Sequence, residues 1–290
     1  MKKVGFACVY GRANAGKSTI INKCLGFKLL PVSSKPQTTR DNVHAIYNDE
    51  DSQIVFVDTP GVFKAHGKLG SILLRDAESA KDGVDVIVYV IDASEVPNFE
   101  LAEKLKNENV PVIIAYNKVD LVSMDIGESR LARYLQFLPN AEVIRMSAKD
   151  GFGIAELLVA IKNHFEEGDV IFPEDIVSDR PREYIMSEII REKCMRLLSA
   201  EVPHTIYVDL THVLEEEGML EIYADIIVEK ESEKAIVIGK GGKMISEIAR
   251  FSEQSISSYF GMPSHCELHV KAIPDWRNQD KYLKKFGYEE

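Results

Sequence analysis

The sequence has little of what marks a secreted, membrane-spanning or diffusely basic protein. Its four cysteines are scattered without a C-x-x-C pair, so they support neither a disulfide framework nor a zinc knuckle. No apolar stretch approaches the length of a membrane span, and Met1–Val4 leads into an apolar strand pattern without a signal peptide. Lysine and arginine number 35 against 46 aspartates and glutamates, which excludes a wholly basic module. We therefore expect a cytoplasmic protein without a transmembrane segment.

A glycine-rich loop follows the first apolar run, Val4 to Tyr10, and leads into a predicted helix. Its pattern is G-x-x-x-x-G-K-S. A strand, a loop of this kind and a helix start present unpaired backbone N–H groups to an anion, while the lysine reaches the β- and γ-phosphates and the serine ligates magnesium. The sequence therefore predicts that a nucleoside triphosphate and Mg²⁺ bind at Gly11, Arg12, Ala13, Asn14, Ala15, Gly16, Lys17, Ser18 and Thr19.

A second motif closes the apolar run Ile54 to Val57. A carboxylate at this strand end can hold a magnesium-bound water, and a glycine three residues later offers an N–H to the γ-phosphate. The predicted sensor of the triphosphate is therefore Asp58, Thr59, Pro60 and Gly61.

Two further motifs predict which base is bound. Asn117-Lys118-Val119-Asp120 follows the apolar run Val112 to Tyr116, and the Asp120 carboxylate can accept hydrogen bonds from N1–H and the 2-amino group of guanine. Adenine lacks this donor pair, and a site with unmatched acceptors rejects it. The tripeptide Ser147-Ala148-Lys149 supplies a backbone N–H near guanine O6. We therefore predict guanine recognition by Asn117, Lys118, Asp120, Ser147, Ala148 and Lys149.

The spacing of these motifs resembles that of a Ras-like G domain. In such domains a threonine between the first helix and the next strand closes over magnesium, and two threonines, Thr38 and Thr39, compete for this role. Similar GTPases with a Thr-Thr-Arg pattern use the second, so we expect Thr39 to be the ligand. The resemblance implies that Lys17 and magnesium offset charge on the phosphates. It implies that Ser18 and Thr39 ligate magnesium and that Asp58 contacts it through a water. The catalytic residues implied are Lys17, Thr39 and Gly61.

Position 62 departs from the Ras pattern, because Val62 stands where a glutamine would orient the attacking water. Hydrolysis is then slow, or is completed by another group, a partner or a monovalent cation. Similar GTPases use an asparagine at the position of Asn14 to help bind potassium, which makes K⁺ a candidate cofactor. The alternative is that Asn14 only shapes the loop.

The first 165 residues alternate between strand and helix patterns, which predicts an α/β fold with a mostly parallel sheet flanked by helices. One antiparallel hairpin is expected, from 43–48 and 53–57; the runs 84–91, 110–116 and 142–146 are predicted to be buried on both faces. The stretch Pro60 to Gly83 lacks a strict period and is expected to be a mobile switch. An acidic, proline-bearing segment begins at Glu166. We expect a G domain over 1–170, a linker over 171–182 and a second domain over 183–290.

The second half carries another glycine loop, Ile238-Gly239-Lys240-Gly241-Gly242-Lys243, which lacks the G-K-S ending. The expected order is helix, two strands, helix, G-x-x-G, helix, strand. This order looks like an α+β type II KH domain, whose glycines let the backbone lie against about four nucleotides. The predicted RNA-binding residues are Ile236, Ile238, Gly239, Lys240, Gly241, Gly242, Lys243 and Ile245, with Ile248 in the apolar floor.

Charge is divided within this second half. Ten carboxylates and one lysine lie between Glu201 and Glu233, whereas Lys234 to Lys285 holds nine bases and five acids. A locally positive groove beside an acidic face favours a short, specific RNA site over diffuse binding.

Taken together, the Thr-Thr-Arg, D-T-P-G, N-K-x-D and S-A-K motifs and the C-terminal G-x-x-G half resemble the bacterial Era GTPase family over nearly the whole chain. That resemblance implies a GTPase that assists maturation of the small ribosomal subunit. It also implies that the KH domain binds the 3′ end of 16S ribosomal RNA when GTP is bound, and that a peripheral fraction associates with the inner membrane. We expect a monomer.

Three alternatives are open at this point. A tRNA-modification GTPase shares the loop asparagine and the Thr-Thr-Arg pattern but needs a catalytic domain for which this chain has no room. An adenine-specific enzyme would bind ATP in competition with GTP. An RNA-binding protein with an essentially non-hydrolysing G domain is the third, and Val62 motivates it.

Overall fold

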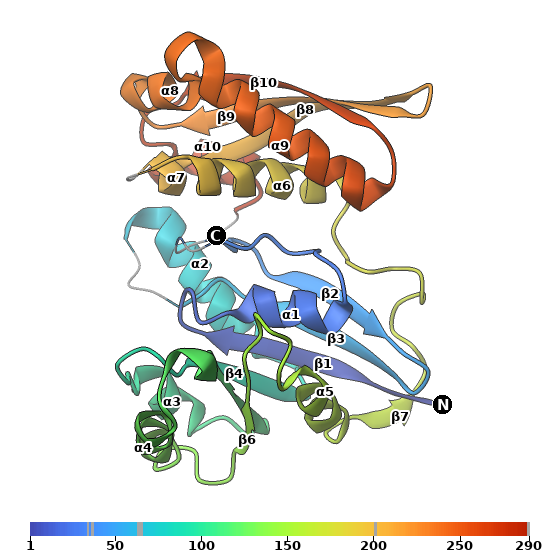
Figure 1. The fold of residues 1–290 in the computed structure, drawn as a ribbon, viewed down its shortest axis with the longest axis vertical. Helices are drawn as coiled ribbons and strands as arrows, with labels where there is room; N and C mark the ends of the chain where they lie inside the picture. The colour runs from blue at the N-terminus through green and yellow to red at the C-terminus, as the bar shows by residue number, and fades with distance from the viewer. Residues whose placement is uncertain (34, 36–37, 63–65, 200–201, 289–290) are drawn as a thin grey trace. The chain divides into compact units, whose positions relative to one another are not determined.

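The computed structural model describes residues 1–33, 35, 38–62, 66–199 and 202–288. The chain forms two compact units. The first contains residues 1–30, 39–64 and 73–179, and the second contains 31–38, 65–72 and 180–290. Figure 1 shows most of the first unit in blue to green and most of the second in yellow to red. Each unit has its own sheet and its own core, as two sequence patterns of different kind predict.

The first unit is built on a sheet with the strand order β2-β3-β1-β4-β5-β6. Strand β2 is antiparallel to β3, and the other neighbours in this order are parallel. The predicted hairpin and parallel strands are therefore confirmed. The strands are β1 (Lys2–Gly11), β2 (Val43–Asn48), β3 (Ser52–Asp58), β4 (Val86–Asp92), β5 (Val112–Asn117) and β6 (Glu142–Arg145).

Helices cover both faces of this sheet (Figure 1). On one face α1 (Lys17–Leu25) lies against α5 (Ile154–Lys162). On the other, apolar residues of α3 (Glu100–Leu105) and α4 (Met124–Tyr134) join a buried cluster with the strands. Alternate side chains of each central strand therefore face different helices, which explains why these strands are apolar on both faces. The phosphate loop, Asp58 and Asn117 all come at carboxyl ends of strands, at one edge of the sheet.

One sequence expectation for this unit is wrong, and two segments have regular structure that the sequence pattern did not predict. Strand β6 lies at the sheet edge, and its Glu142 and Arg145 are exposed, so it is not buried on both faces. The stretch Pro60 to Gly83 contains a 13-residue helix, α2 (Gly67–Ser79), because buried leucines and isoleucine recur on one side of it. Residues Glu166–Gly168 form β7, which pairs antiparallel with the start of β1. Backbone hydrogen bonds hold this acidic segment in the sheet, although its side-chain composition is typical of a linker.

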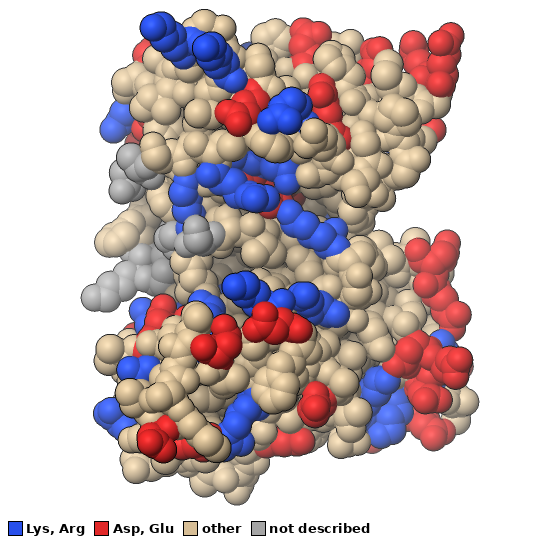
Figure 2. All heavy atoms as spheres, viewed as in Figure 1, with Lys and Arg blue, Asp and Glu red and all other residues tan. Residues whose placement is uncertain are grey.

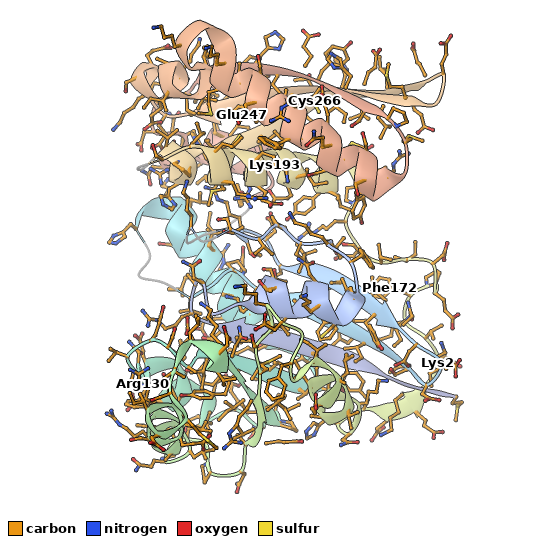
Figure 3. All side chains as sticks on the ribbon, in the orientation of Figure 1. Lys2, Arg130, Phe172, Lys193, Glu247 and Cys266 are labelled. Carbon is orange, nitrogen blue, oxygen red and sulfur yellow. The ribbon has the colours of Figure 1, made fainter. Side chains whose placement is uncertain are left out.

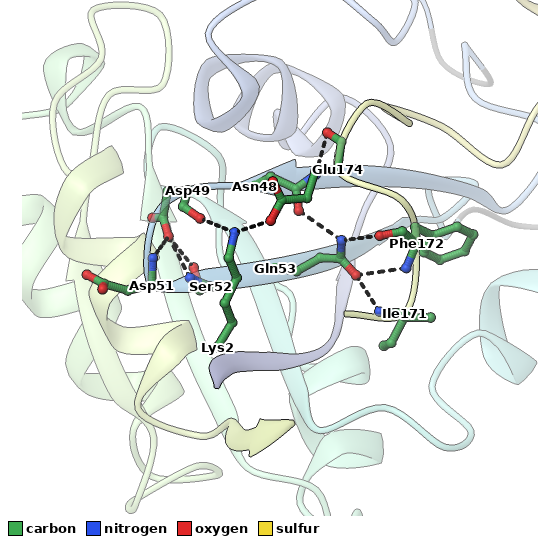
Figure 4. A network of polar contacts seen from close by, with 9 residues as sticks. All are labelled: Lys2, Asn48, Asp49, Asp51, Ser52, Gln53, Ile171, Phe172 and Glu174. Atoms are coloured by element: carbon green, nitrogen blue, oxygen red, sulfur yellow. Dashed lines mark hydrogen bonds and ion pairs between the residues drawn. The ribbon is translucent and has the colours of Figure 1, made fainter. Parts of the chain in front are cut away.

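The predicted linker is anchored to the first sheet over 171–178. The buried amide of Gln53 accepts hydrogen bonds from the backbone N–H groups of Ile171 (2.7 Å) and Phe172 (3.0 Å) and donates to the Phe172 carbonyl (2.8 Å) (Figure 4). Lys2 pairs with Glu174 at 2.6 Å. The Ile46 N–H of edge strand β2 donates to the Val177 carbonyl at 3.0 Å, so this segment covers part of an open sheet edge.

The second unit contains a three-stranded sheet in the order β10-β9-β8, with β8 antiparallel and β10 parallel to β9. Helices α6, α8 and α9 bury one face of this sheet in a single apolar cluster. Figure 3 labels Cys266, buried on β10, and Glu247, which is exposed on α9. The elements are α6 (Arg182–Leu197), α7 (Val202–Thr205), β8 (Tyr207–Glu216), β9 (Met219–Val228), α8 (Glu231–Ile238), α9 (Lys243–Phe260), β10 (Ser264–Ala272) and α10 (Asp280–Lys285).

The four cysteines are free and buried, as expected for a chain without a disulfide framework. Within the described part of the chain, none of the helices combines the length and apolar character required to cross a bilayer.

Candidate nucleotide and RNA sites

The phosphate loop joins β1 to α1 over residues 12–16. Gly16 has a left-handed φ of 107°, and a Cβ there would lie 2.3 Å from the side-chain nitrogen of Asn117, so a larger residue would be strained and crowded. No side chain caps α1 at Gly16, which leaves the first N–H groups of this nine-residue helix to an anion.

Lys17 is nearly buried in this loop, with 6% of its surface exposed. Its ammonium donates to the carbonyls of Gly11 (3.2 Å) and Arg12 (3.1 Å). Burial lowers the pKa of Lys17 to about 8, and the charge of Asp58 opposes that shift. Two neutral carbonyls do not replace the water that this ammonium has lost, so an added phosphate oxygen would be favoured strongly.

Asp58 brings the magnesium candidates together. Its Oδ2 accepts hydrogen bonds from Ser18 (2.8 Å) and Thr39 (3.1 Å), whose hydroxyl oxygens lie 3.1 Å apart. Its Oδ1 is buried and has no hydrogen-bond partner among the described residues. Burial raises the pKa of Asp58, and the charge of Lys17 opposes this. An oxygen-rich cluster with one unpartnered carboxylate oxygen fits hard Mg²⁺ and its water ligands.

The geometry distinguishes between the two threonines. Thr39 lies beside Asp58 and Ser18, whereas the Thr38 hydroxyl donates to the Lys35 carbonyl at 2.8 Å. This arrangement supports Thr39 as the candidate ligand.

The D-T-P-G segment packs directly on the phosphate loop. The Val62 N–H donates to the Gly11 carbonyl at 3.1 Å, and Thr59 donates to the Val9 carbonyl at 2.9 Å. A Cβ on Gly61 would lie 2.5 Å from Cα of Ala13, so glycine is required for this approach. The Val62 side chain packs against the apolar cluster of the sheet and offers no polar group to water.

Asn117 links the phosphate loop to the S-A-K segment. Its amide donates to the Ala15 carbonyl at 2.8 Å and accepts from the Ala148 N–H at 3.0 Å, and only 2% of the residue is exposed. Asp120 and Lys149 are exposed at this edge of the sheet. An exposed carboxylate between two fixed loops is suited to accept hydrogen bonds from a guanine base.

One residue at this edge escaped the sequence reasoning. Asp92 ends β4, and its carboxylate pairs with Lys118 at 2.6 Å. Lys118 also donates to the Asn14 carbonyl at 2.8 Å. The position of Asp92 could have indicated it, since β4 ends at the same edge of the sheet as the strands that carry the other motifs. Asp92 itself belongs to no sequence motif.

The second glycine loop joins α8 to α9, as predicted. Gly239, Gly241 and Gly242 all have left-handed φ values, of 73°, 61° and 76°. A Cβ on Gly239 would lie 2.6 Å from that of Met244, whereas Gly241 and Gly242 face open space. The backbone is therefore accessible at these two glycines, and the flanking Lys240 and Lys243 are exposed.

The predicted apolar floor is only partly supported by the placement of its isoleucines. Ile236 is 48% exposed beside the loop, and Ile238 and Ile245 are partly buried against the core. Ile248 is fully buried and is a core residue. Residues that recur with a helical period lie on the face of the helix that packs against the core, so such residues are more often core residues than ligand-binding residues.

Charge on the second unit is divided as the sequence predicts. Figure 2 shows basic side chains near the α8–α9 junction and acidic side chains at the tip of the β8–β9 hairpin. The residues concerned are Lys240 and Lys243 at the junction and Glu215, Glu216 and Glu217 at the tip.

Two family models match the chain. The model described as a 50S ribosome-binding GTPase matches residues 6–118, and a KH domain model matches residues 201–277. Both predicted domain types are thereby confirmed.

Two solved structures are similar over the whole length. A variant of Era from Aquifex aeolicus, bound to GDP and AlF4⁻, is 35% identical with a TM-score of 0.94, covering 99% of this chain and 100% of that one. The structure of Era in complex with MgGDPNP and nucleotides 1506–1542 of 16S ribosomal RNA is 34% identical, with a TM-score of 0.95 and complete coverage of both chains.

Proposed function

Because the chain belongs to the Era family of GTPases, we propose that it binds and hydrolyses GTP and binds the 3′ end of 16S ribosomal RNA through its KH domain. The single observation that carries this is the match over the full length of two Era structures, one with a GTP analogue, magnesium and that RNA. In this assignment residues 1–170 are the G domain, 171–182 the linker and 183–290 the KH domain, and the protein assists small-subunit maturation.

The geometry of the site supports the roles that we propose for its residues. Ser18, Thr39 and, through water, Asp58 would hold magnesium, which when bound would offset negative charge on the phosphates. Lys17 holds a proton at Nζ next to those oxygens, and Gly61 presents its N–H to the terminal phosphate. Loss of that phosphate releases Thr39 and Gly61 together. Thr38, the residue directly before Thr39 in the chain, belongs to the second compact unit, and this supports coupling of nucleotide state to RNA binding.

Potassium activation is a finer part of the proposal. Asn14 has a left-handed φ of 63° in the phosphate loop, and Val62 leaves the attacking water without a glutamine. A K⁺ ion beside the phosphates would supply the missing charge. Phosphate release should therefore rise when sodium is replaced by potassium at equal ionic strength.

The test combines hydrolysis with RNA binding. Phosphate release from GTP is measured with and without a 16S 3′-end oligonucleotide, whose affinity is measured with a GTP analogue and with GDP. The Lys240→Ala, Lys243→Ala double variant should weaken RNA binding and flatten its salt dependence. A matched double variant, Lys281→Ala with Lys284→Ala on α10, removes two exposed lysines of the same unit and should leave RNA binding unchanged. Equal affinity for GTP and ATP would refute the assignment.

Val62 favours one second candidate, an RNA-binding protein whose G domain regulates without appreciable hydrolysis. Its side chain lies in an apolar cluster, so it cannot orient water. Absence of phosphate release with potassium and RNA both present would establish this candidate.

Localisation and oligomeric state complete the proposal. We expect a cytoplasmic monomer with a peripheral fraction at the inner membrane, on the family resemblance alone. Cell fractionation and sedimentation test these two expectations.

A further inference from the structure

Both carboxylate oxygens of Asp92 accept hydrogen bonds at the carboxyl end of β4. Its Oδ1 accepts from the backbone N–H of Ser94 (2.9 Å) and from the Ser94 hydroxyl (2.6 Å). Its Oδ2 accepts from the ammonium of Lys118 at 2.6 Å. The side chain is only 6% exposed. The serine therefore orients the carboxylate, and the second oxygen is directed at the lysine.

Lys118 is held at both ends by neighbouring elements. Its backbone has a left-handed φ of 63°, and the preceding Asn117 carbonyl accepts from the Ala93 N–H at 2.8 Å. Its ammonium lies between Asp92 and the Asn14 carbonyl. Arg130 of α4, labelled in Figure 3, donates to the Ala93 carbonyl at 2.8 Å and steadies the same turn. One lysine thus joins the ends of β4 and β5 to the phosphate loop.

We propose that Asp92 is a positioning residue for the guanine nucleotide and acts through Lys118. A lysine side chain has several rotatable bonds, and a carboxylate partner offsets the entropy lost when they are fixed. With that partner the ammonium stays on the Asn14 carbonyl, which fixes the N-K-x-D segment against the phosphate loop. The contact lies on the loop carbonyl and not on a phosphate, so it supports GDP and GTP equally. This inference rests on the proposed nucleotide binding.

The test compares Asp92→Asn with Asp225→Asn. Asp225 is an equally buried strand aspartate (9% of the side chain exposed) that pairs with Lys271 at 2.5 Å in the second unit, so its variant removes the same chemistry away from the nucleotide site. Fluorescent GDP and GTP analogues are titrated into each full-length variant. Asp92→Asn should raise both Kd values by about 10-fold and leave kcat at saturating GTP within about twofold. Asp225→Asn should leave both Kd values unchanged.

A double-mutant cycle separates positioning from general support of the fold. If Asp92 acts through Lys118, then Asp92→Asn should change Kd little in a Lys118→Met background. Additive effects, an unchanged Kd in Asp92→Asn, or an equal rise in Asp225→Asn would each overturn the inference. If Asp92→Asn does not fold, the Ser94→Ala variant provides a second test. It removes only the hydroxyl donor to the Asp92 carboxylate and should still raise both Kd values by about threefold. Wild-type protein that binds neither nucleotide would instead refute the proposed function.

Discussion

Replacing Asn117 by alanine should detach the phosphate loop from the S-A-K segment. The amide lies between the Ala15 carbonyl and the Ala148 N–H, at 2.8 and 3.0 Å. Alanine removes both hydrogen bonds at a position that is 2% exposed, so water cannot easily replace them. It also leaves open the space that the amide occupies next to Gly16.

The expected size follows from the two bonds. A buried polar group left without its partner costs about 1–3 kcal/mol, so two such losses predict about 2–6 kcal/mol in total. If this cost falls on the nucleotide complex, the Kd for GDP rises by about 30- to 20,000-fold. Both loops must be in place together to bind one nucleotide, so the loss should appear for GDP and GTP alike. Titration of a fluorescent GDP analogue measures it directly.

Asn22→Ala provides the matched control. Asn22 also bridges backbone groups of the first unit, accepting from the N–H groups of Leu29 and Leu30 and donating to the Leu30 carbonyl. Both variants should lower the melting temperature, but Asn22→Ala should leave the GDP Kd within about twofold, because no bond to either nucleotide loop is lost. An unchanged Kd in Asn117→Ala, or the same rise in both variants, would refute this reasoning.

Three other outcomes are expected. Gly61→Ala places a Cβ 2.5 Å from the Ala13 backbone and should reduce GTP affinity at least tenfold relative to GDP in calorimetric titrations, whereas Gly168→Ala, with nothing within 4 Å, should not. The pKa of Lys17 is about 8 in the protein alone, and a bound phosphate raises it. GTP binding above pH 8 therefore takes up a proton. The Kd for GTP, titrated on both sides of pH 8, should rise above that pH by up to about tenfold per pH unit. Gln53→Ala frees the segment at Phe172, so limited proteolysis should cut there faster than in the exposed-residue control Gln254→Ala.

Local patterns predicted the central parts of this fold well. The strand Val43–Asn48 is found residue for residue, and Lys17 begins the expected helix. These elements are encoded within a few residues, by an apolar run, a glycine turn and a helix start. The nucleotide motifs were predictable for the same reason, since strand ends at one edge of a parallel sheet bring their loops together.

Contacts between distant parts of the chain were not predictable in this way. The pairing of Glu166–Gly168 with Lys2–Val4 depends on backbone groups, so no side-chain pattern marks it. The linker is anchored by residues more than a hundred positions earlier in the chain, among them Gln53 and Lys2. Asp92 is similar, because an aspartate at the end of a strand becomes informative only when its lysine partner is seen.

The buried pair of charges at the phosphate site gives the clearest link between structure and switching. Burial lowers the pKa of Lys17 and raises that of Asp58, so each group is biased toward its neutral form despite the other's opposite charge. For the protein alone, Lys17 loses its proton near pH 8, whereas in the unfolded chain it keeps it to its ordinary value of 10.5. The free energy of unfolding should therefore increase with pH between these values. A phosphate held by Lys17, and a magnesium ion whose water Asp58 would hold, would relieve both penalties at once. Relief of both penalties is part of the binding free energy, so it lowers Kd and stabilises the folded protein through mass action. This stabilisation should diminish above pH 8, because the Lys17 proton must then be taken up from solution.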